Sequence, residues 1–441
     1  MCYNKRVCYY TSFKELIRLA IKYNREKLGD GIHYNSIINE RQKTNTVIMH
    51  FVTGLSQETA SLNAVIPYIL AGSSSVYPTL TELNKKLSEL YGAVLKGSVS
   101  KMGDSQVLSL MAGCINDRYA FDGEAVTEEM TKVMTGCLTS PHLQDGVFFE
   151  KDFELKKQEL IDDIEAEINE KRSFAFKRAN INIFKDEPAA VSVKGDVSHA
   201  EKLTPADAYR QYLELLKTAQ IEIFFVGAQE SAGCKKIITD ALNSIDRAFG
   251  GDNSSAKSPL KGEVCRVTER YDVAQSKMVM GFKTDCGDPV ALKLMNAIFG
   301  ATPISKLFMN VREKLSLCYY CSSGYNDKKG TLYVDSGVEQ ENIAKAEAEI
   351  LNQLDAVRRG DFTDEDMENA RKSIMNSWRG VSDGARSIAE WYFSRSYSGD
   401  FSSPEEMIEK LKKITREDVI KAAESVKLDT VYVLTGKEAK A

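Results

Sequence analysis

Histidine is scarce in this chain. Its 441 residues include four histidines, His33, His50, His142 and His199, and none lies within five positions of another. Neither HExxH nor its inverse HxxEH therefore occurs, so no two imidazoles lie one helical turn apart, as they do in zinc peptidases with these motifs. We predict that the chain holds no metal ion of its own.

Several broad classes of protein are excluded by what else is missing. No stretch approaches the 18 apolar residues of a membrane span, and the first 15 residues contain four charged residues and no apolar core of a signal peptide. The net charge of −5 argues against a nucleic-acid partner, because phosphate binding needs clustered Lys and Arg. Nine scattered cysteines are typical of reduced thiols. We expect a cytoplasmic protein without a membrane span.

Familiar nucleophile and phosphate motifs are also missing. There is no Gly-x-Ser-x-Gly elbow, and the segment that begins at Gly72 lacks the Gly-Lys-Ser/Thr ending of a phosphate loop. One Cys-x-x-Cys occurs, from Cys318 to Cys321. Its surroundings predict a strand, in which positions i and i+3 point to opposite faces. We expect two unrelated buried thiols there, and not a redox pair.

What the chain does contain is a long internal repeat. Five positions recur with an offset of 214 and keep their identity or charge: Gly146, Phe148, Asp152, Glu154 and Lys157 match Gly360, Phe362, Asp366, Glu368 and Arg371. Segments 46–51 and 221–227 resemble segments 277–282 and 430–436 in the same order. A repeat of this length indicates two homologous domains and not a solenoid.

The boundary between the two domains is visible in the composition. Residues 247–262 are rich in Gly, Ser and Pro, as linkers are. They separate a first domain, residues 28–246, from a second, residues 263–441. Residues 12–26 predict an amphipathic helix that starts with a capping box from Ser12 to Glu15, so residues 1–27 are predicted to form a helical extension.

Within each unit the predicted elements follow one order. A strand (45–53; 276–283) precedes two helices (59–71 and 79–91; 288–299 and 303–313). Two strands joined by a turn follow (93–100 and 105–114; 316–325 and 330–337), then long helices, and a last strand (221–226; 430–435). This order predicts an α+β fold with two homologous domains, each a mostly antiparallel sheet covered by helices.

Segment 305–320 combines a cation with a phenol. A predicted helix ends at Arg312 and leads into a strand that begins near Tyr319. Such a pair at the rim of a sheet can bind a peptide carbonyl or a developing oxyanion. The alternative is structural: the arginine caps the helix C-terminus and the tyrosine packs on the sheet. The residues alone leave both interpretations open.

The duplication, segment 305–320 and the pattern Gly360, Phe362, Asp366 together resemble the insulinase/mitochondrial-processing-peptidase superfamily of zinc peptidases. The resemblance covers about residues 28–441. In that family two homologous domains form one half of a clam shell, and two halves enclose an unfolded peptide. The resemblance implies the same half shell here, with a second half as partner.

The family's HxxEH motif precedes a stretch that resembles residues 77–83 of this chain. Counting back, Ala64 and Tyr68 replace the two histidines, and Pro67 replaces the glutamate that acts as general base. The third ligand aligns with Asp163, with a slip of one helical turn left open. The resemblance therefore implies a degenerate site without zinc in this chain.

Active members of the family complete their site with an Arg and a Tyr of the second domain, acting across the shell. The matching positions are Arg312 and Tyr319, or Tyr320 if the register shifts by one. The chain most resembles metal-less members encoded beside an active partner in Gram-positive bacteria. This implies a catalytically incomplete subunit of a heterodimeric zinc metallopeptidase that cleaves unfolded peptides, with zinc in the partner. The alternative is a non-catalytic scaffold or peptide-binding protein of the same fold.

Overall fold

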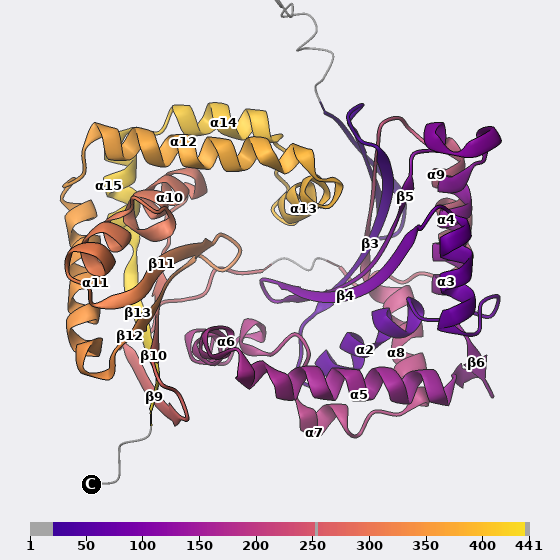
Figure 1. Cartoon of the computed structure of the whole chain (residues 1–441), viewed down its shortest axis with the longest axis horizontal. Coiled ribbons are helices and arrows are strands. Elements are labelled where there is room, and N and C mark those ends of the chain that lie inside the picture. Colours follow the sequence, from indigo (N-terminus) through magenta and orange to yellow (C-terminus); the bar gives the residue numbers. More distant parts are fainter. Residues whose placement is uncertain (1–20, 252–254, 437–441) are drawn as a thin grey trace, which may run out of the picture.

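Two units of sheet and helices make up the protein (Figure 1). The structure, a computed structural model, describes residues 21–251 and 255–436. Within these ranges no helix is long and apolar enough to cross a membrane.

The first unit contains a six-stranded sheet. In spatial order its strands are β1 (Lys22–Gly29), β2 (Ile32–Ile38), β8 (Gln220–Gly227), β3 (Thr44–Gly54), β5 (Ser105–Ile115) and β4 (Val94–Met102). Neighbours are antiparallel except β2 and β8. β3 lies inside the sheet with both faces covered, so its side chains are buried from Asn45 to Val52. β4 is an edge strand.

The second unit repeats this arrangement with five strands. Their order is β11 (Cys318–Asn326), β12 (Thr331–Val338), β10 (Ser276–Lys283), β13 (Lys427–Gly436) and β9 (Cys265–Tyr271). Only β13 and β9 are parallel. The predicted α+β fold with two mostly antiparallel sheets is therefore confirmed, and β11 occupies the edge that β4 occupies in the first unit.

The predicted helix over residues 12–26 is wrong where the structure tests it. Residues 12–20 lie outside the described residues, and residues 22–29 form β1, antiparallel to β2. Exposure alternates with a period of two from Lys22 onward, as on an edge strand. The ring of Tyr23 stacks on Tyr392 with centroids 3.9 Å apart, so a contact distant in sequence holds this segment in the sheet.

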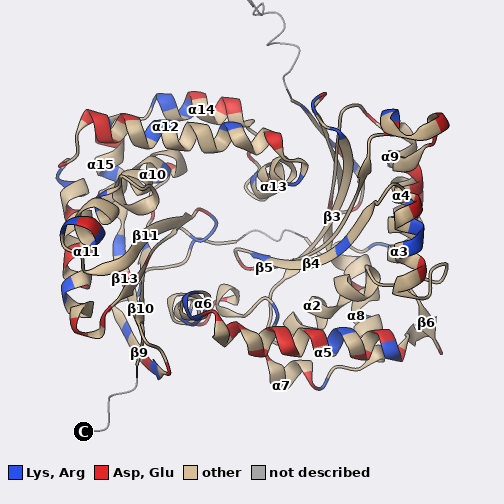
Figure 2. Ribbon diagram, in the orientation of Figure 1, with Lys and Arg blue, Asp and Glu red and all other residues tan. Residues whose placement is uncertain are grey.

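One face of each sheet is covered by the helices of its own unit. In the first unit these are α2 (Ala60–Leu70), α3 (Leu80–Glu89), α4 (Val126–Thr139), α5 (Glu150–Ala166), α7 (Val197–Ala200), α8 (Pro205–Thr218) and α9 (Ala232–Asn243), with the short hairpin β6 (Leu143–Gln144) and β7 (Val147–Phe148). In the second unit they are α10 (Pro289–Asn296), α11 (Ile343–Arg358), α12 (Asp364–Gly380), α14 (Pro404–Lys412) and α15 (Arg416–Ser425), with the π-helices η5 (Ala297–Ala301) and η6 (Leu307–Lys314). Charged residues lie along the outer helices, whereas the strands are mostly uncharged (Figure 2).

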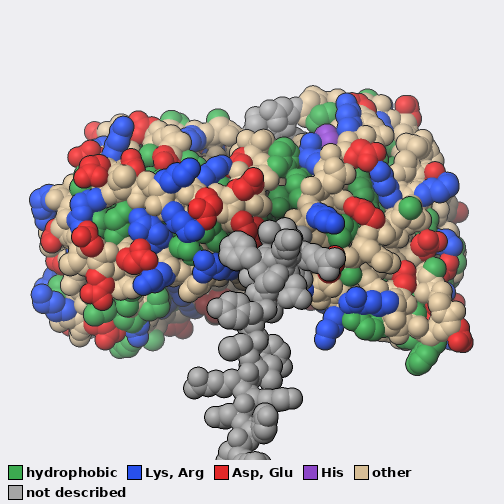
Figure 3. Space-filling model, turned by 90° about the horizontal axis from the view of Figure 1, so that it is seen from above, with side chains coloured by type: hydrophobic (Ala, Val, Ile, Leu, Met, Phe, Trp, Pro, Cys, Tyr) green, Lys and Arg blue, Asp and Glu red, His purple; other side chains and the backbone are tan. Residues whose placement is uncertain are grey.

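The two units exchange one helix each. α6 (Lys171–Ile183) and α13 (Ala385–Ser396) begin at residues 171 and 385, again an offset of 214. α13 covers the second face of the first sheet, where Tyr392 and Phe393 pack on Phe224. α6 covers the second face of the second sheet, where Ile183 packs with Tyr432. Helices of its own unit thus cover one face of each sheet, and a helix from the other unit covers the second face (Figure 1). Seen from above, hydrophobic side chains gather where the two units meet (Figure 3).

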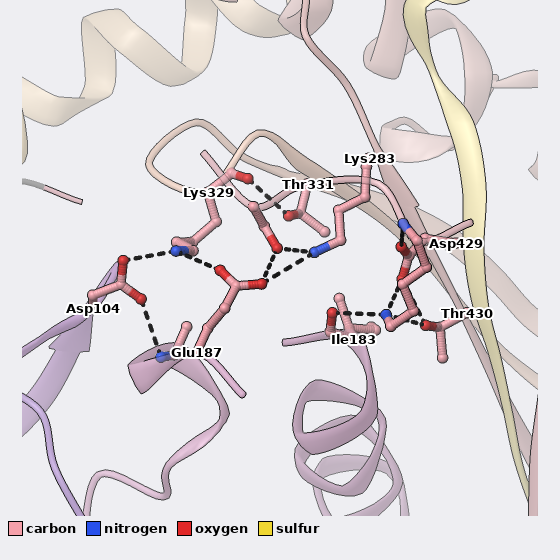
Figure 4. Close-up of polar contacts among 11 residues, drawn as sticks. Asp104, Ile183, Glu187, Lys283, Lys329, Thr331, Asp429 and Thr430 are labelled. Carbon is pink, nitrogen blue, oxygen red and sulfur yellow. Dashed lines mark hydrogen bonds and ion pairs between the residues drawn. The ribbon is translucent and has the colours of Figure 1, made fainter. Parts of the chain in front are cut away.

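A buried polar network joins the units between these helices (Figure 4). The ammonium of Lys329, on the β11–β12 turn, lies 2.7 Å from Asp104 Oδ2 and 2.8 Å from Glu187 Oε2. Ser258 also bonds to Glu187 and to Lys283. Burial raises the pKa of Glu187, but the bonds from Lys329 and Ser258 outweigh it and hold that pKa below its usual range. The network fixes the two sheets relative to each other.

Candidate functional site

Helix α2 carries the positions of the degenerate zinc motif, and the helix is almost wholly buried. Ala64 has no exposed surface, Pro67 is buried, and Tyr68 is half-buried. Pro67 lies inside the helix and has no N–H to donate to the preceding turn. This segment is a packing element of the first core.

The edge strand β4 lies directly against this part of α2. A Cβ atom on Gly97 would come within 2.0 Å of the carbonyl oxygen of Pro67 and 2.9 Å of the Tyr68 nitrogen. Only a glycine allows β4 to approach the helix backbone this closely. The space beside the degenerate motif is therefore filled by main chain.

Asp163, the position aligned with the third zinc ligand, lies on α5. Its side chain is 62% exposed and forms an ion pair with Lys194 at 2.8 Å. On α2 the buried amide of Asn63 donates to Gln106 at 2.8 Å and accepts from Gln211 at 2.8 Å. Within residues 21–251 and 255–436, no three His, Cys, Asp or Glu side chains are grouped to hold a metal ion.

This donor set does not fit zinc. The metal needs three or four nitrogen, sulfur or carboxylate ligands, whereas the motif positions offer a methyl group, a pyrrolidine ring and a phenol. The single aligned carboxylate is already paired with a lysine. The first unit therefore has no group among its described residues that could activate a water molecule in the manner of a zinc peptidase.

Arg312 lies on η6 in the second unit. The segment is a π-helix, as the bond from the Leu315 nitrogen to the Asn310 carbonyl at 3.1 Å shows; such widened turns are frequent at functional sites. The guanidinium lies 4.6 Å from the Phe308 ring centroid and its Nε lies 3.4 Å from Glu313 Oε1. Its side chain is 40% exposed, so the cation remains accessible.

Tyr319 follows within the same segment, at the start of β11. Cys318 pairs with Val338 and Tyr320 with Gly337, so Tyr319 is the extra residue of a β-bulge. Its side chain is 65% exposed. Tyr319 is therefore exposed on the edge strand β11, in the same segment as the exposed guanidinium of Arg312.

Tyr320, the alternative position, is enclosed. The guanidinium carbon of Arg172, on α6, lies 4.2 Å from its ring centroid, and the Lys277 ammonium lies 5.6 Å from it. The phenol oxygen is buried beside the carboxylate of Asp335. Burial raises the pKa of Tyr320, with nearby Asp335 adding to the effect. The two neighbouring tyrosines thus differ in access to any outside molecule.

The bulge also corrects the expected placement of the two cysteines. Cys318 and Cys321 do not point to opposite faces: both are buried in the same core of the second unit, and each thiol shifts the pKa of the other, downward for Cys318 and upward for Cys321. One extra residue in the strand changes the alternation of side chains. The expectation that residues i and i+3 point to opposite faces applies only to a regular strand without a bulge.

The segment that carries Arg312 and Tyr319 also exposes apolar residues at the surface. Ile304, Met309 and Leu315 are each nearly half-exposed. Sequence reasoning missed them because exposure of an apolar residue depends on the fold. One feature of the sequence could have indicated them: several apolar residues lie close to an arginine in segment 304–319. The same pattern, however, is also compatible with a buried helix.

Comparison with known proteins indicates the same family resemblance as the sequence motifs. Residues 202–374 match the model of the peptidase M16 inactive domain. A probable inactive metalloprotease of Bacillus subtilis, YmfF, is 27% identical over 413 residues, which cover 92% of this chain and 96% of that protein. An uncharacterised zinc protease of Rickettsia bellii is 21% identical over 324 residues, covering 70% and 76%.

Solved structures share the whole architecture. A conserved protein from Enterococcus faecalis superposes with a TM-score of 0.87 at 26% identity, covering 95% of this chain and 100% of that chain. A protease from Helicobacter pylori has a TM-score of 0.78 at 14% identity, covering 94% and 100%, which shows the fold alone. Residues 202–374 thus match the M16 inactive domain, and most of the chain is similar to inactive metalloprotease and zinc protease sequences, with the fold of M16-like peptidases and without an HxxEH motif.

Proposed function

We propose that this chain is the catalytically incomplete subunit of a two-chain peptidase, lending Arg312 and Tyr319 to a homologous partner that carries HxxEH. The observation that carries the proposal is an asymmetry. The positions of the zinc motif are buried and filled by Ala64 and Pro67, whereas the guanidinium and phenol of the second unit remain exposed at a sheet edge.

The chemistry of the two groups suits this role. The Tyr319 hydroxyl donates a hydrogen bond to the oxygen of the scissile carbonyl as negative charge develops on it. Arg312 offers N–H groups to a neighbouring peptide carbonyl or carboxylate. Neither group can attack a peptide bond in this role, so the water activation must come from the other subunit.

The two adjacent tyrosines provide a matched test. In the reconstituted pair, Tyr319→Phe should lower kcat for peptide cleavage about 100-fold, the cost of losing one oxyanion donor. Tyr320→Phe should leave kcat within about twofold, because that phenol is enclosed beneath Arg172. Arg312→Ala should raise KM as well as lower kcat.

The opposite pattern would contradict the proposal. Full activity in Tyr319→Phe and Arg312→Ala would show that neither side chain takes part in cleavage. The chain would then be a scaffold or a peptide-binding protein of the same fold. In that case its open edges β4 and β11 remain available for strand addition by an extended peptide.

A further inference from the structure

A cavity of about 550 Å³ lies in the second unit, and none of its lining residues belongs to η6. Its walls come from the start of α10, the ends of α12 and α13, from α14, and from the β11–β12 turn. Both tryptophans of the chain line it. Trp378 and Trp391 meet edge to face with centroids 5.9 Å apart. The volume is that of a site for a small molecule or a peptide end, and we call it the tryptophan pocket.

The aromatic part of the tryptophan pocket is rigidly built. Trp378 is only 4% exposed and Met407 5% exposed, so both lie in the wall of the core. The indole N–H of Trp391 donates to the Ser402 carbonyl at 3.0 Å. With its N–H already bonded, Trp391 offers a bound molecule the apolar surface of its ring.

Most charged groups around the pocket are already paired. The Arg395 guanidinium stacks on Trp391 at 4.4 Å and bonds to Asp400 at 2.5 Å. Asp288 accepts hydrogen bonds from two backbone N–H groups at the start of α10. Lys410 donates to Ser402 at 2.9 Å. None of these groups needs a ligand to satisfy it.

Lys293 is different. It projects from α10 with its ammonium 5.7 Å from the Trp378 ring centroid. It has no hydrogen bond or ion pair with any residue of 21–251 or 255–436. The nearby carboxylate of Asp327 lies instead 3.3 Å from the ammonium of Lys328. An ammonium beside the Trp378 ring that forms no ion pair among the described residues, and on which Asp327 acts only from beyond ion-pair distance, favours a ligand that is anionic at one end and apolar next to it.

We propose that the tryptophan pocket binds the C-terminal end of a peptide. The terminal carboxylate pairs with Lys293, and an apolar last side chain lies against Trp378 and Trp391. One free ammonium matches one carboxylate, whereas a phosphate dianion needs several donors, and the other donors here are bonded. That the ligand is a peptide rests on the proposed function; the pocket would hold it away from Arg312 and Tyr319.

Because both tryptophans of the chain line the tryptophan pocket, their fluorescence can measure binding there. The full chain alone is titrated with an N-acetylated tripeptide ending in leucine, as free acid and as amide, and tryptophan fluorescence is recorded. The acid should bind about tenfold tighter than the amide or more, the value of one charged hydrogen bond. Lys293→Gln should abolish this preference. Lys236→Gln, on an exposed side chain of the first unit, should retain it.

Several results would overturn the proposal: equal affinities for acid and amide, no saturable fluorescence change, acetate competing as well as the tripeptide, or an unchanged preference in Lys293→Gln. The readout needs neither a partner nor catalysis. Tyr319→Phe should leave this binding unchanged, so a failure here is distinguishable from a failure of the proposed subunit role.

Discussion

At the scale of single residues, His50 couples the stability of the protein to pH. The ring is fully buried in β3, stacks on Phe393 of α13 at 4.0 Å, and bonds through Nδ1 to Ser109 at 2.8 Å. Burial lowers the pKa of His50 from 6.5 to about 3, although the charge of Glu222 opposes this shift.

The sign of the effect follows from the depressed pKa. The unfolded chain takes up a proton on His50 below pH 6.5 while the folded chain does not, so stability falls as the pH is lowered. We expect a loss of roughly 1.4 kcal/mol per pH unit from this group. Urea unfolding at pH 7 and pH 5 should show a smaller acid loss in His50→Phe than in the wild type. Equal losses in the two proteins would contradict this account.

Residue patterns predicted part of the candidate site. Segment 305–320 identified the Arg312 region, but the sequence could not choose between Tyr319 and Tyr320. That choice depends on a β-bulge, which is set by pairing with Gly337 across the sheet, and on Arg172 from the other unit. Neither the bulge nor the position of Arg172 can be inferred from the spacing of neighbouring residues in the sequence.

At the scale of elements, the contact between α2 and β4 should be sensitive to a single methyl group. Gly97→Ala would place a Cβ atom against the Pro67 carbonyl, and we expect a loss of about 1–3 kcal/mol in the free energy of unfolding, as in overpacked cores. Gly324→Ala is the matched control, because Gly324 lies on the equivalent edge strand β11 and a Cβ atom added there would meet nothing within 4 Å. Similar unfolding midpoints for the two variants in urea would disprove the close contact.

The repeat predicted most elements well. β10 spans residues 276–283, as the β-branched pattern indicated, and α5 and α12 keep the offset of 214. β1, β2 and β9 were missed. β2 and β9 are held by parallel pairing with the distant strands β8 and β13, and β1 pairs in turn with β2. The exchange of α6 and α13 was equally invisible, since no local signal says which sheet a helix will cover.

At the scale of the whole molecule, the network around Lys329 holds the two units together. Lys329 is 2% exposed and neutralises both Asp104 and Glu187. Lys329→Met would leave two carboxylates without their main partner, and we expect a loss of about 3–5 kcal/mol. Lys236→Met, at a 75% exposed side chain, should change the unfolding midpoint little. If Lys329→Met unfolds at the wild-type urea concentration, the network does not hold the units together.

The proposed division of roles between two chains depends on which of the two chains binds zinc. The most direct measurement is zinc content and peptide cleavage by the purified chain, alone and mixed with a homologous chain that carries HxxEH, the partner that we propose. We predict no bound zinc and no cleavage by this chain alone, and cleavage in the mixture that exceeds that of the partner alone. One zinc per chain, together with cleavage by this chain alone, would contradict the assignment of Ala64, Pro67 and Tyr68 as a degenerate motif.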